Sequence, residues 1–270
     1  MKIIVCVKQV PDTSGKVAVN PDGTLDRASM QTITNPDDMN AVEAALKLKD
    51  ETGCMVTVVT MGPPPAMGML RELMAMGADS AVLVSAREFG GSDTYATSQI
   101  LAAAIKRIGL EPDDIVMCGR QAIDGDTAQV GPQIAEKLGM PQVTYVAEMH
   151  KTGDTITVKR MLEDGYMTIK VQTPCLLTCI KELNTPRYMS VAGIYSTYDK
   201  PLDTFNYESL KDDSLIDPAT IGLKGSPTNI FKSFTPPLKG AGVKLLKMLV
   251  GEPFRPMVAG SIRESSFSDS

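Results

Sequence analysis

The sequence predicts an α/β fold, in which a parallel sheet carries an antiparallel hairpin extension and a C-terminal arm. Three observations in the 270-residue chain lead to this prediction. Short apolar runs alternate with segments of helical apolar spacing through residues 1–140. Strict apolar–polar alternation then flanks a Lys-Thr-Gly-Asp turn at residues 151–154, as in a β-hairpin. From residue 184 onward the periodicity is weak, and Pro, Ser, Asp and Lys are frequent, which favours an extended arm.

Apolar runs in the first half of the chain are predicted as the parallel strands. They are Lys2–Val7, Met55–Met61, Ala81–Ser85 and Asp114–Cys118. Because these runs are apolar over most of their length and do not alternate, we expect helices to cover the sheet on both faces. The carboxyl ends of the strands would then share one edge, which is where sheets of this kind bind ligands.

Four helices are predicted to follow or connect these strands. The first begins at Pro36, with Asn35 as N-cap, acidic residues in its first turn and Gly53 at its end. The others are a helix through Leu70, Leu73 and Met74 that stops at Gly77, a helix capped by Ser92 or Asp93 that runs to about Ile108, and a helix over Thr127–Leu138.

The remaining elements divide the chain into a domain over residues 1–185 and an arm over residues 186–270. A hairpin is predicted inside the long excursion 8–34, around an Asn-Pro-Asp-Gly turn at residues 20–23. The hairpin extension and the strand after it are predicted at Gln142–His150, Thr155–Met161, Met167–Gln172 and Cys175–Ile180.

Composition excludes several classes of protein. The net charge is −5 and no dense basic patch is present, so we expect no nucleic-acid ligand. The sequence contains no run of about 18 apolar residues, so we predict no membrane span. The short apolar run after Met1 resembles a core strand more than a signal peptide. The five cysteines lie mostly in apolar segments, as reduced core cysteines do, which favours a cytoplasmic location.

Three loops follow strand ends and should converge on one edge of the sheet. They are residues 6–12, 60–63 and 119–131. In the third loop, Gly119 and Gly125 would let the backbone approach a ligand closely. Asp126 as N-cap with Gln129 three residues later would leave the N–H groups of Thr127 and Ala128 free at a helix start.

That helix start is a candidate site for a phosphate or pyrophosphate. The Thr127 hydroxyl and the Arg120 charge would add to it. The alternative is an ordinary capped helix in a surface loop. The carboxylates of Asp124 and Asp126 weigh against phosphate binding, and Pro132 is expected to kink the helix.

Other candidate sites are weak, and we predict neither a catalytic residue nor a metal site. His150 is the only histidine and lies beside a predicted turn, so a surface position is favoured. Cys175 and Cys179 would be about 13 Å apart in a strand, beyond the reach of a disulfide. Glu163 and Asp164 precede Gly165 and favour a polar turn over a catalytic pair. A nucleotide-binding protein without acid–base residues suits a cofactor that performs its own chemistry.

Five segments, in order, give the chain a resemblance to electron-transfer flavoprotein beta subunits over about residues 1–240. They are residues 7–12 (Val-Lys-Gln-Val-Pro-Asp), 35–38 (Asn-Pro-Asp-Asp), 74–79 (Met-Ala-Met-Gly-Ala-Asp), 119–126 (Gly-Arg-Gln-Ala-Ile-Asp-Gly-Asp) and 183–188 (Leu-Asn-Thr-Pro-Arg-Tyr). The resemblance implies an adenine-nucleotide alpha-hydrolase-like, nucleotide-binding α/β domain. It also implies a larger, flavin-binding alpha subunit as partner.

The family binds either FAD or AMP in this subunit. The resemblance, together with the three loops, places the cofactor contacts on Cys6, Lys8, Asn35, Asp38, Met61, Gly62, Gly119, Arg120, Gln121, Ala122, Asp124, Gly125, Asp126, Thr127, Ala128, Gln129, Val130 and Gly131. It further implies that Val191 is the apolar anchor that binds an acyl-CoA dehydrogenase.

Residues 8–13, Lys-Gln-Val-Pro-Asp-Thr, resemble the electron-bifurcating branch of anaerobic bacteria. That resemblance implies FAD as cofactor, NADH as electron donor, and two acceptors. The acceptors are ferredoxin and, through the partner flavin, an acyl-CoA dehydrogenase or reductase. Two alternatives stay open: a non-bifurcating beta subunit with a structural AMP, and a stand-alone adenine-nucleotide-binding regulator or hydrolase.

Overall fold

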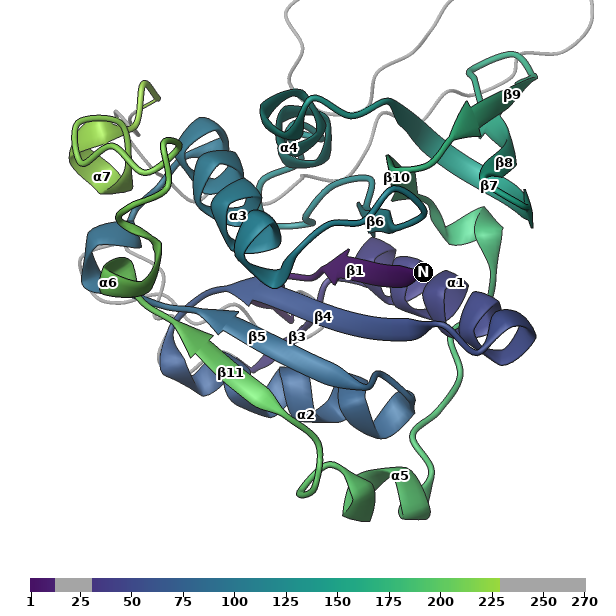
Figure 1. The fold of residues 1–270 in the computed structure, drawn as a ribbon, viewed down its shortest axis with the longest axis horizontal. Coiled ribbons are helices and arrows are strands. Elements are labelled where there is room, and N and C mark those ends of the chain that lie inside the picture. The colour runs from purple at the N-terminus through teal and green to yellow at the C-terminus, as the bar shows by residue number, and fades with distance from the viewer. Residues whose placement is uncertain (13–30, 229–270) are drawn as a thin grey trace, which may run out of the picture.

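A nine-stranded sheet forms the centre of the molecule (Figure 1). The computed structural model describes residues 1–12 and 31–228. The strand order is β11-β5-β4-β1-β6-β10-β7-β8-β9. These strands are β1 (Lys2–Cys6), β4 (Met55–Met61), β5 (Ser80–Val84), β6 (Ile115–Gly119), β7 (Gln142–Thr152), β8 (Thr155–Met161), β9 (Tyr166–Gln172), β10 (Cys175–Cys179) and β11 (Leu202–Phe205).

The sheet is parallel from β11 through β7 and antiparallel from β7 through β9. Strand β1 lies in the middle, with Cys6 opposite Val59 of β4 on one side and Cys118 of β6 on the other. Buried strands in a parallel sheet read as continuous apolar runs, which is why the sequence identifies them. The predicted α/β fold with a mostly parallel sheet and a hairpin extension is confirmed.

Four helices cover the two faces of the sheet (Figure 1). Helices α1 (Pro36–Thr52) and α2 (Met67–Met76) pack on one face, around Val42, Leu46 and Leu70. Helices α3 (Thr94–Ile108) and α4 (Val130–Leu138) pack on the other face, around Ile100 and Ile134. Each face of the sheet therefore has its own apolar core. The loops that connect strands and helices carry many polar residues.

Three of the four predicted helix boundaries are confirmed. Asn35 is the N-cap of α1, and Gly53 ends it in a left-handed conformation, with its N–H donating to the Lys49 carbonyl. Gly77 ends α2, and Asp93 caps α3 by accepting the N–H of Ala96.

The predicted start of the fourth helix is wrong. Helix α4 begins at Val130, three residues later than predicted, and its N-cap is Gln129. Asp126 and Ala128 have φ values of 50° and 52°, which a right-handed helix excludes. Pro132 consequently lies in the first turn, where a missing N–H is tolerated, so the expected kink has no basis.

The second half of the chain adds short elements to this core. The predicted hairpin β7–β8 and the strand β9 after it are confirmed. Beyond the 3-10 turn η3 (Lys181–Leu183), the predicted arm forms α5 (Val191–Ser196), β11, α6 (Tyr207–Leu210) and α7 (Gly222–Gly225). Strand β11 pairs with β5 and so extends the sheet by one strand.

The excursion after β1 forms a small second sheet. Strands β2 (Gln9–Pro11) and β3 (Thr32–Thr34) pair antiparallel. The hairpin predicted around residues 20–23 falls outside the described residues, as does the arm beyond residue 228. Two further turns, η1 (Pro64–Ala66) and η2 (Arg87–Phe89), follow β4 and β5.

Candidate functional site

Three loops meet at the carboxyl edge of the parallel strands. We call residues 6–12, 60–63 and 119–131 the edge loops. They follow β1, β4 and β6, which are neighbours in the sheet. Their convergence on one edge is as the sequence predicts. Cys6 is buried at the end of β1, Lys8 is exposed just beyond it, and Met61 and Gly62 lie half-buried at the end of β4.

Asp38, in the first turn of α1, joins two of the edge loops. One carboxylate oxygen accepts the N–H of Lys8 at 2.8 Å, and the other accepts the N–H of Gly119 at 2.7 Å. The side chain is buried, with 6% of the residue exposed. Asp38 therefore fixes the loops after β1 and β6 relative to α1, and both of its oxygens are already engaged by the protein.

Asn35 connects the same loops one residue before the helix. Its side-chain N–H donates to the Gln121 carbonyl at 2.8 Å, and its oxygen accepts the Ile123 N–H at 3.1 Å. Its own backbone N–H donates to the Lys8 carbonyl. The Lys8 ammonium in turn contacts both carboxylate oxygens of Asp124 at 2.8 Å. The loop over 119–131 is thus anchored on α1 and on the loop after β1.

The three glycines of the loop over 119–131 have different environments. A Cβ on Gly119 would lie 2.5 Å from the nearer Asp38 oxygen and 2.6 Å from the Asp38 backbone nitrogen. Gly119 is therefore required by packing against α1, which corrects the expectation that it leaves room for a ligand. Gly131 is likewise tight, with Cys118 Sγ 2.8 Å from its virtual Cβ. Only Gly125, with nothing within 4 Å, has the open surroundings that the sequence analysis expected.

The backbone between Asp126 and Gly131 carries free hydrogen-bond donors. Within the described part of the chain, no acceptor takes the N–H groups of Thr127, Ala128 or Gly131. Two contacts keep this stretch in place. Asp126 accepts from the Gln121 amide at 2.8 Å, and Gln129 accepts from the Thr94 hydroxyl at 3.0 Å. A run of free N–H groups just before and at a helix start suits an anion, although the donors belong mainly to the loop.

Arg120 contributes a positively charged guanidinium group that makes few polar contacts among the described residues. Its Nε lies 3.2 Å from the Asp37 carboxylate, and its guanidinium lies 5.9 Å from the centre of the Tyr145 ring. The angle of the ion pair leaves Arg120 Nε and Asp37 Oδ2 without a hydrogen bond among the described residues, although both atoms are buried. The Thr60 hydroxyl, at the end of β4, is in the same situation. Arg120 Nε and Asp37 Oδ2 nevertheless face each other as an ion pair. The Thr60 hydroxyl at this sheet edge has no such partner, which fits a polar ligand.

The ionisable groups at this edge favour binding over catalysis. Burial, together with the nearby Asp38, raises the pKa of the Cys6 thiol to about 12, so it stays protonated and unreactive near neutral pH. Burial raises the pKa of Asp38 to about 7, against the opposing effect of its backbone hydrogen bonds. His150 is exposed on β7, and Glu163 and Asp164 are exposed in a turn. All five cysteines are free and buried, as predicted.

Some residues at this edge could not be found from sequence. Thr94, Asp37 and Tyr145 all contact the loop over 119–131 or its Arg120, yet they lie on α3, α1 and β7. A positive φ of 58° at Tyr145 marks a local irregularity of β7 that no turn residue signals. Among the described residues, no cluster of His, Cys, Asp or Glu is placed to hold a metal ion.

A second feature of the chain is a run of exposed apolar side chains after η3. We call residues 188–198 the exposed segment. Val191, the first residue of α5, is 72% exposed. The other large exposed side chains of this segment are Tyr188, Met189, Ile194, Tyr195 and Tyr198. The segment borders a hollow of about 220 Å³ on α2, which Arg71, Ala75 and Ile194 help to line.

Comparison with known proteins assigns the chain. The model of the electron transfer flavoprotein domain matches residues 22–210. This chain belongs to the electron transfer flavoprotein family. It is 55% identical over 243 residues to the electron transfer flavoprotein subunit beta of Clostridium acetobutylicum, which covers 90% of this chain and 91% of that protein.

Two relatives of this electron transfer flavoprotein beta subunit carry names of larger complexes. The acryloyl-CoA reductase electron transfer subunit gamma of Anaerotignum propionicum is 72% identical over 91% of this chain and 92% of its own length. The caffeyl-CoA reductase-Etf complex subunit CarD of Acetobacterium woodii is 53% identical over 97% of this chain and 96% of its own length. The predicted family is confirmed, and its members serve as subunits of electron-transfer complexes. No helix in the described ranges has both the length and the apolar character needed to cross a bilayer.

Proposed function

We propose that this chain binds FAD at the edge loops and acts as the beta subunit of an electron-bifurcating electron-transfer flavoprotein. The proposal rests on the run of free N–H groups over Thr127–Gly131 at the carboxyl edge of a parallel sheet, and on Arg120 at the start of the same loop. Family membership adds a reason for the ligand to be a flavin nucleotide. When bound, FAD would accept two electrons as a hydride and could release them one at a time.

The protein's own residues would bind and orient the nucleotide. The N–H groups of Thr127, Ala128 and Gly131 would donate to the pyrophosphate, and Arg120 would neutralise part of its charge. Gly125 leaves room for the ligand's close approach. Asn35 and Asp38 would support the site without contacting the nucleotide, because their polar atoms are bonded to the loops.

Two carboxylates near this site require an explanation, since they would repel phosphate. Asp124 is neutralised by Lys8, and Asp126 accepts from the Gln121 amide. Asp124 is therefore paired with the loop after β1, and Asp126 is hydrogen-bonded within its own loop. Their cost to anion binding falls accordingly, and a free oxygen of Asp126 remains for a ribose hydroxyl.

The partners follow from the family and from the names of the relatives. We propose a heterodimer with an electron-transfer flavoprotein alpha subunit in the cytoplasm. NADH is the donor, ferredoxin is one acceptor, and an acyl-CoA dehydrogenase or reductase is the other. The two relatives named as subunits of acryloyl-CoA and caffeyl-CoA reductase complexes support an acyl-CoA partner. Residues 8–13, which resemble the bifurcating branch, support NADH and ferredoxin.

We further propose that the exposed segment binds the dehydrogenase, with Val191 as its apolar anchor. Val191 is 72% exposed, and three exposed tyrosines accompany it. Exposed aromatic and aliphatic side chains of this kind form the centre of protein interfaces. The exposed segment, residues 188–198, is therefore the proposed docking segment.

Two other functions remain as competing outcomes. In a non-bifurcating beta subunit, AMP would occupy the same phosphate site and NADH would not be oxidised. A stand-alone regulator or hydrolase would bind or turn over ATP without a partner subunit.

Electron bifurcation is tested with the purified heterodimer. NADH should bleach the flavin absorbance. Ferredoxin reduction by NADH should then require the dehydrogenase and its enoyl-CoA substrate at the same time. If NADH bleaches the flavin but ferredoxin reduction does not need the dehydrogenase and its substrate, the protein is a simple NADH-linked electron carrier and does not bifurcate electrons. Absence of bleaching would contradict the proposal.

A further inference from the structure

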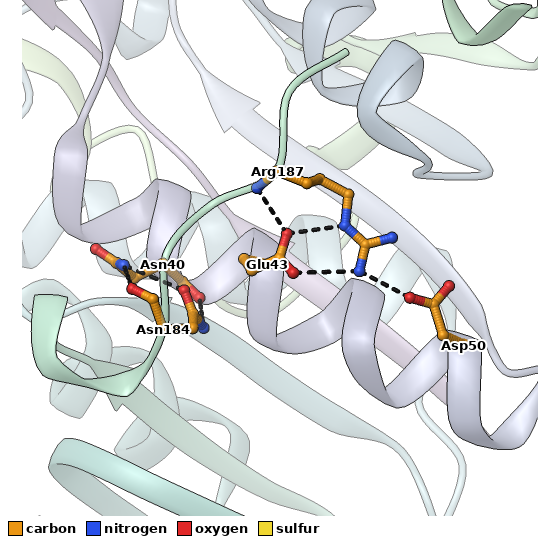
Figure 2. A network of polar contacts seen from close by, with 5 residues as sticks. All are labelled: Asn40, Glu43, Asp50, Asn184 and Arg187. Atoms are coloured by element: carbon orange, nitrogen blue, oxygen red, sulfur yellow. Dashed lines mark hydrogen bonds and ion pairs between the residues drawn. The ribbon is translucent and has the colours of Figure 1, made fainter. Parts of the chain in front are cut away.

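The docking segment is joined to α1 by a network of polar contacts (Figure 2). The Arg187 guanidinium donates to both carboxylate oxygens of Glu43, at 2.9 and 3.2 Å, and its backbone N–H also donates to Glu43 at 3.0 Å. A second guanidinium contact reaches Asp50 at 2.7 Å. The two carboxylates lie on successive parts of one helix face, so the guanidinium is held along that face.

The same stretch of chain is fixed to α1 by a second clamp. The Asn184 amide donates to the Asn40 carbonyl at 2.9 Å, and the Asn40 amide donates to the Asn184 carbonyl at 2.8 Å (Figure 2). Asn40 and Glu43 are buried, at 5% and 3% exposed. Four residues of chain, from 184 to 187, are therefore bonded twice to a buried helix face just before the exposed side chains begin.

Further contacts hold the middle and the end of the docking segment. A Cβ on Gly193 would collide with the carbonyl oxygen of Ala75 on α2, so α5 lies directly against that helix. At the other end, the Lys200 ammonium donates to the carbonyls of Met74 and Ala78 at 2.9 and 2.8 Å. The apolar side chains are thus exposed on a backbone that is held by polar contacts just before and just after the segment and is packed against α2 in its middle.

Helix α1 also carries the contacts that form the edge loops. Asp38, which binds the N–H groups of Lys8 and Gly119, precedes Glu43 by five residues, or about 7.5 Å along the helix axis. One helix therefore contacts the proposed cofactor site through its first turn. Through its second and later turns it binds Asn184 and Arg187, which lead directly into the docking segment.

We propose that Arg187 is a positioning residue for electron delivery: its pair with Glu43 fixes the docking segment on the same helix that anchors the cofactor loops. This inference rests on the proposed docking role of residues 188–198. The pair acts through preorganisation. A segment already ordered before the partner binds loses less conformational freedom on association, and it presents its anchors at a fixed distance from the cofactor.

Removal of one charge alone is a poor test, because Glu43 would remain buried without a partner and could destabilise α1. The double variant Glu43→Gln/Arg187→Gln removes both charges and keeps two amides of similar size. Gly193→Ala disturbs the same segment from α2 and leaves the Arg187 network intact. Lys211→Gln is the matched control, since it removes an exposed ion pair with Glu208 on α6.

The experiment uses the full heterodimer and two readouts. In steady-state electron transfer to the dehydrogenase, the KM for the dehydrogenase should rise about tenfold in the double variant and in Gly193→Ala, with little change in rate at saturation. Flavin content should stay constant. A spin label is placed on Tyr195→Cys of this subunit, whose five native cysteines are all buried, before it is assembled with an unlabelled alpha subunit. The label should become more mobile in both variants and stay unchanged in Lys211→Gln.

The outcomes separate this inference from the docking proposal. If Val191→Asp abolishes transfer but the double variant and Gly193→Ala leave both KM and label mobility unchanged, the positioning role of Arg187 is overturned and docking stands. If Val191→Asp itself leaves transfer unchanged, docking through residues 188–198 fails and the inference falls with it. A rise in KM with a more mobile label supports it.

Discussion

The edge loops and the docking segment share helix α1 as a support but expose opposite kinds of groups. At the edge loops, the side chains of Asn35 and Asp38 from the start of α1 and of Asp124 bond to the protein itself, and the free groups are backbone N–H donors. In the docking segment the backbone is anchored and the free groups are apolar side chains such as Val191 and Tyr195. The first arrangement suits a small anionic ligand, and the second suits a protein surface.

The different roles of the two regions are tested most strongly by a charged side chain in place of the exposed Val191. Val191→Asp should reduce electron transfer to the dehydrogenase by at least about 100-fold, because an interface anchor would become a desolvated carboxylate. The flavin spectrum should not change. Leu223→Asp, at another exposed aliphatic side chain on α7, serves as control and should transfer electrons normally. Equal loss in both variants would remove the special role of Val191.

A charge among the free N–H groups tests the other region. Thr127→Glu should lower cofactor occupancy of the purified heterodimer by about tenfold or more, since a carboxylate would compete for the phosphate position. Thr127→Ser keeps the hydroxyl and should retain the cofactor. Full occupancy in Thr127→Glu would show that the nucleotide phosphate lies elsewhere.

The pH dependence of stability should report the buried carboxyl that joins the edge loops. Folding raises the pKa of Asp38 from 3.8 to about 7, so the folded chain binds this proton more tightly than the unfolded chain. The resulting stabilisation is complete below 3.8 and is lost as the pH rises through about 7, by at most about 4 kcal/mol. In urea unfolding, the stability difference between wild type and Asp38→Asn should therefore shrink from about pH 5 to about pH 7.5. A constant difference would show that Asp38 stays ionised throughout.

Two glycines in one loop separate folding from ligand binding. Gly119→Ala should destabilise the chain by about 2–3 kcal/mol, because its Cβ would collide with Asp38 and the α1 backbone. Gly125→Ala, which meets nothing within 4 Å, should leave chemical unfolding almost unchanged and lower only cofactor occupancy. Similar losses of stability in the two variants would contradict the different environments of these glycines.

The sequence predicts those features whose cause is local. Apolar runs locate the parallel strands, and Asn35, Pro36 and Gly53 locate both ends of α1. It misplaces the start of α4, because an Asp-Thr-Ala-Gln stretch has the composition of a capped helix. The left-handed backbone at Asp126 and Ala128 accompanies contacts with Gln121 and with Thr94, and Thr94 lies on a different helix.

Long-range pairing explains the other limits of prediction. Strand β11 has only four residues, and nothing in them indicates that they pair with β5. Arg187 and Glu43 are separated by 144 positions, so their contact has no local signal. The docking anchor could be named from family resemblance, but the network that fixes its position required the structure.

Cofactor stoichiometry is the sharpest test of whether this subunit binds FAD. The purified heterodimer is denatured, and the released nucleotides are separated and quantified against protein. We expect two FAD and no AMP per heterodimer, with one FAD lost in Thr127→Glu. One FAD with one AMP would contradict FAD binding by this subunit and would leave a phosphate site that holds a structural nucleotide.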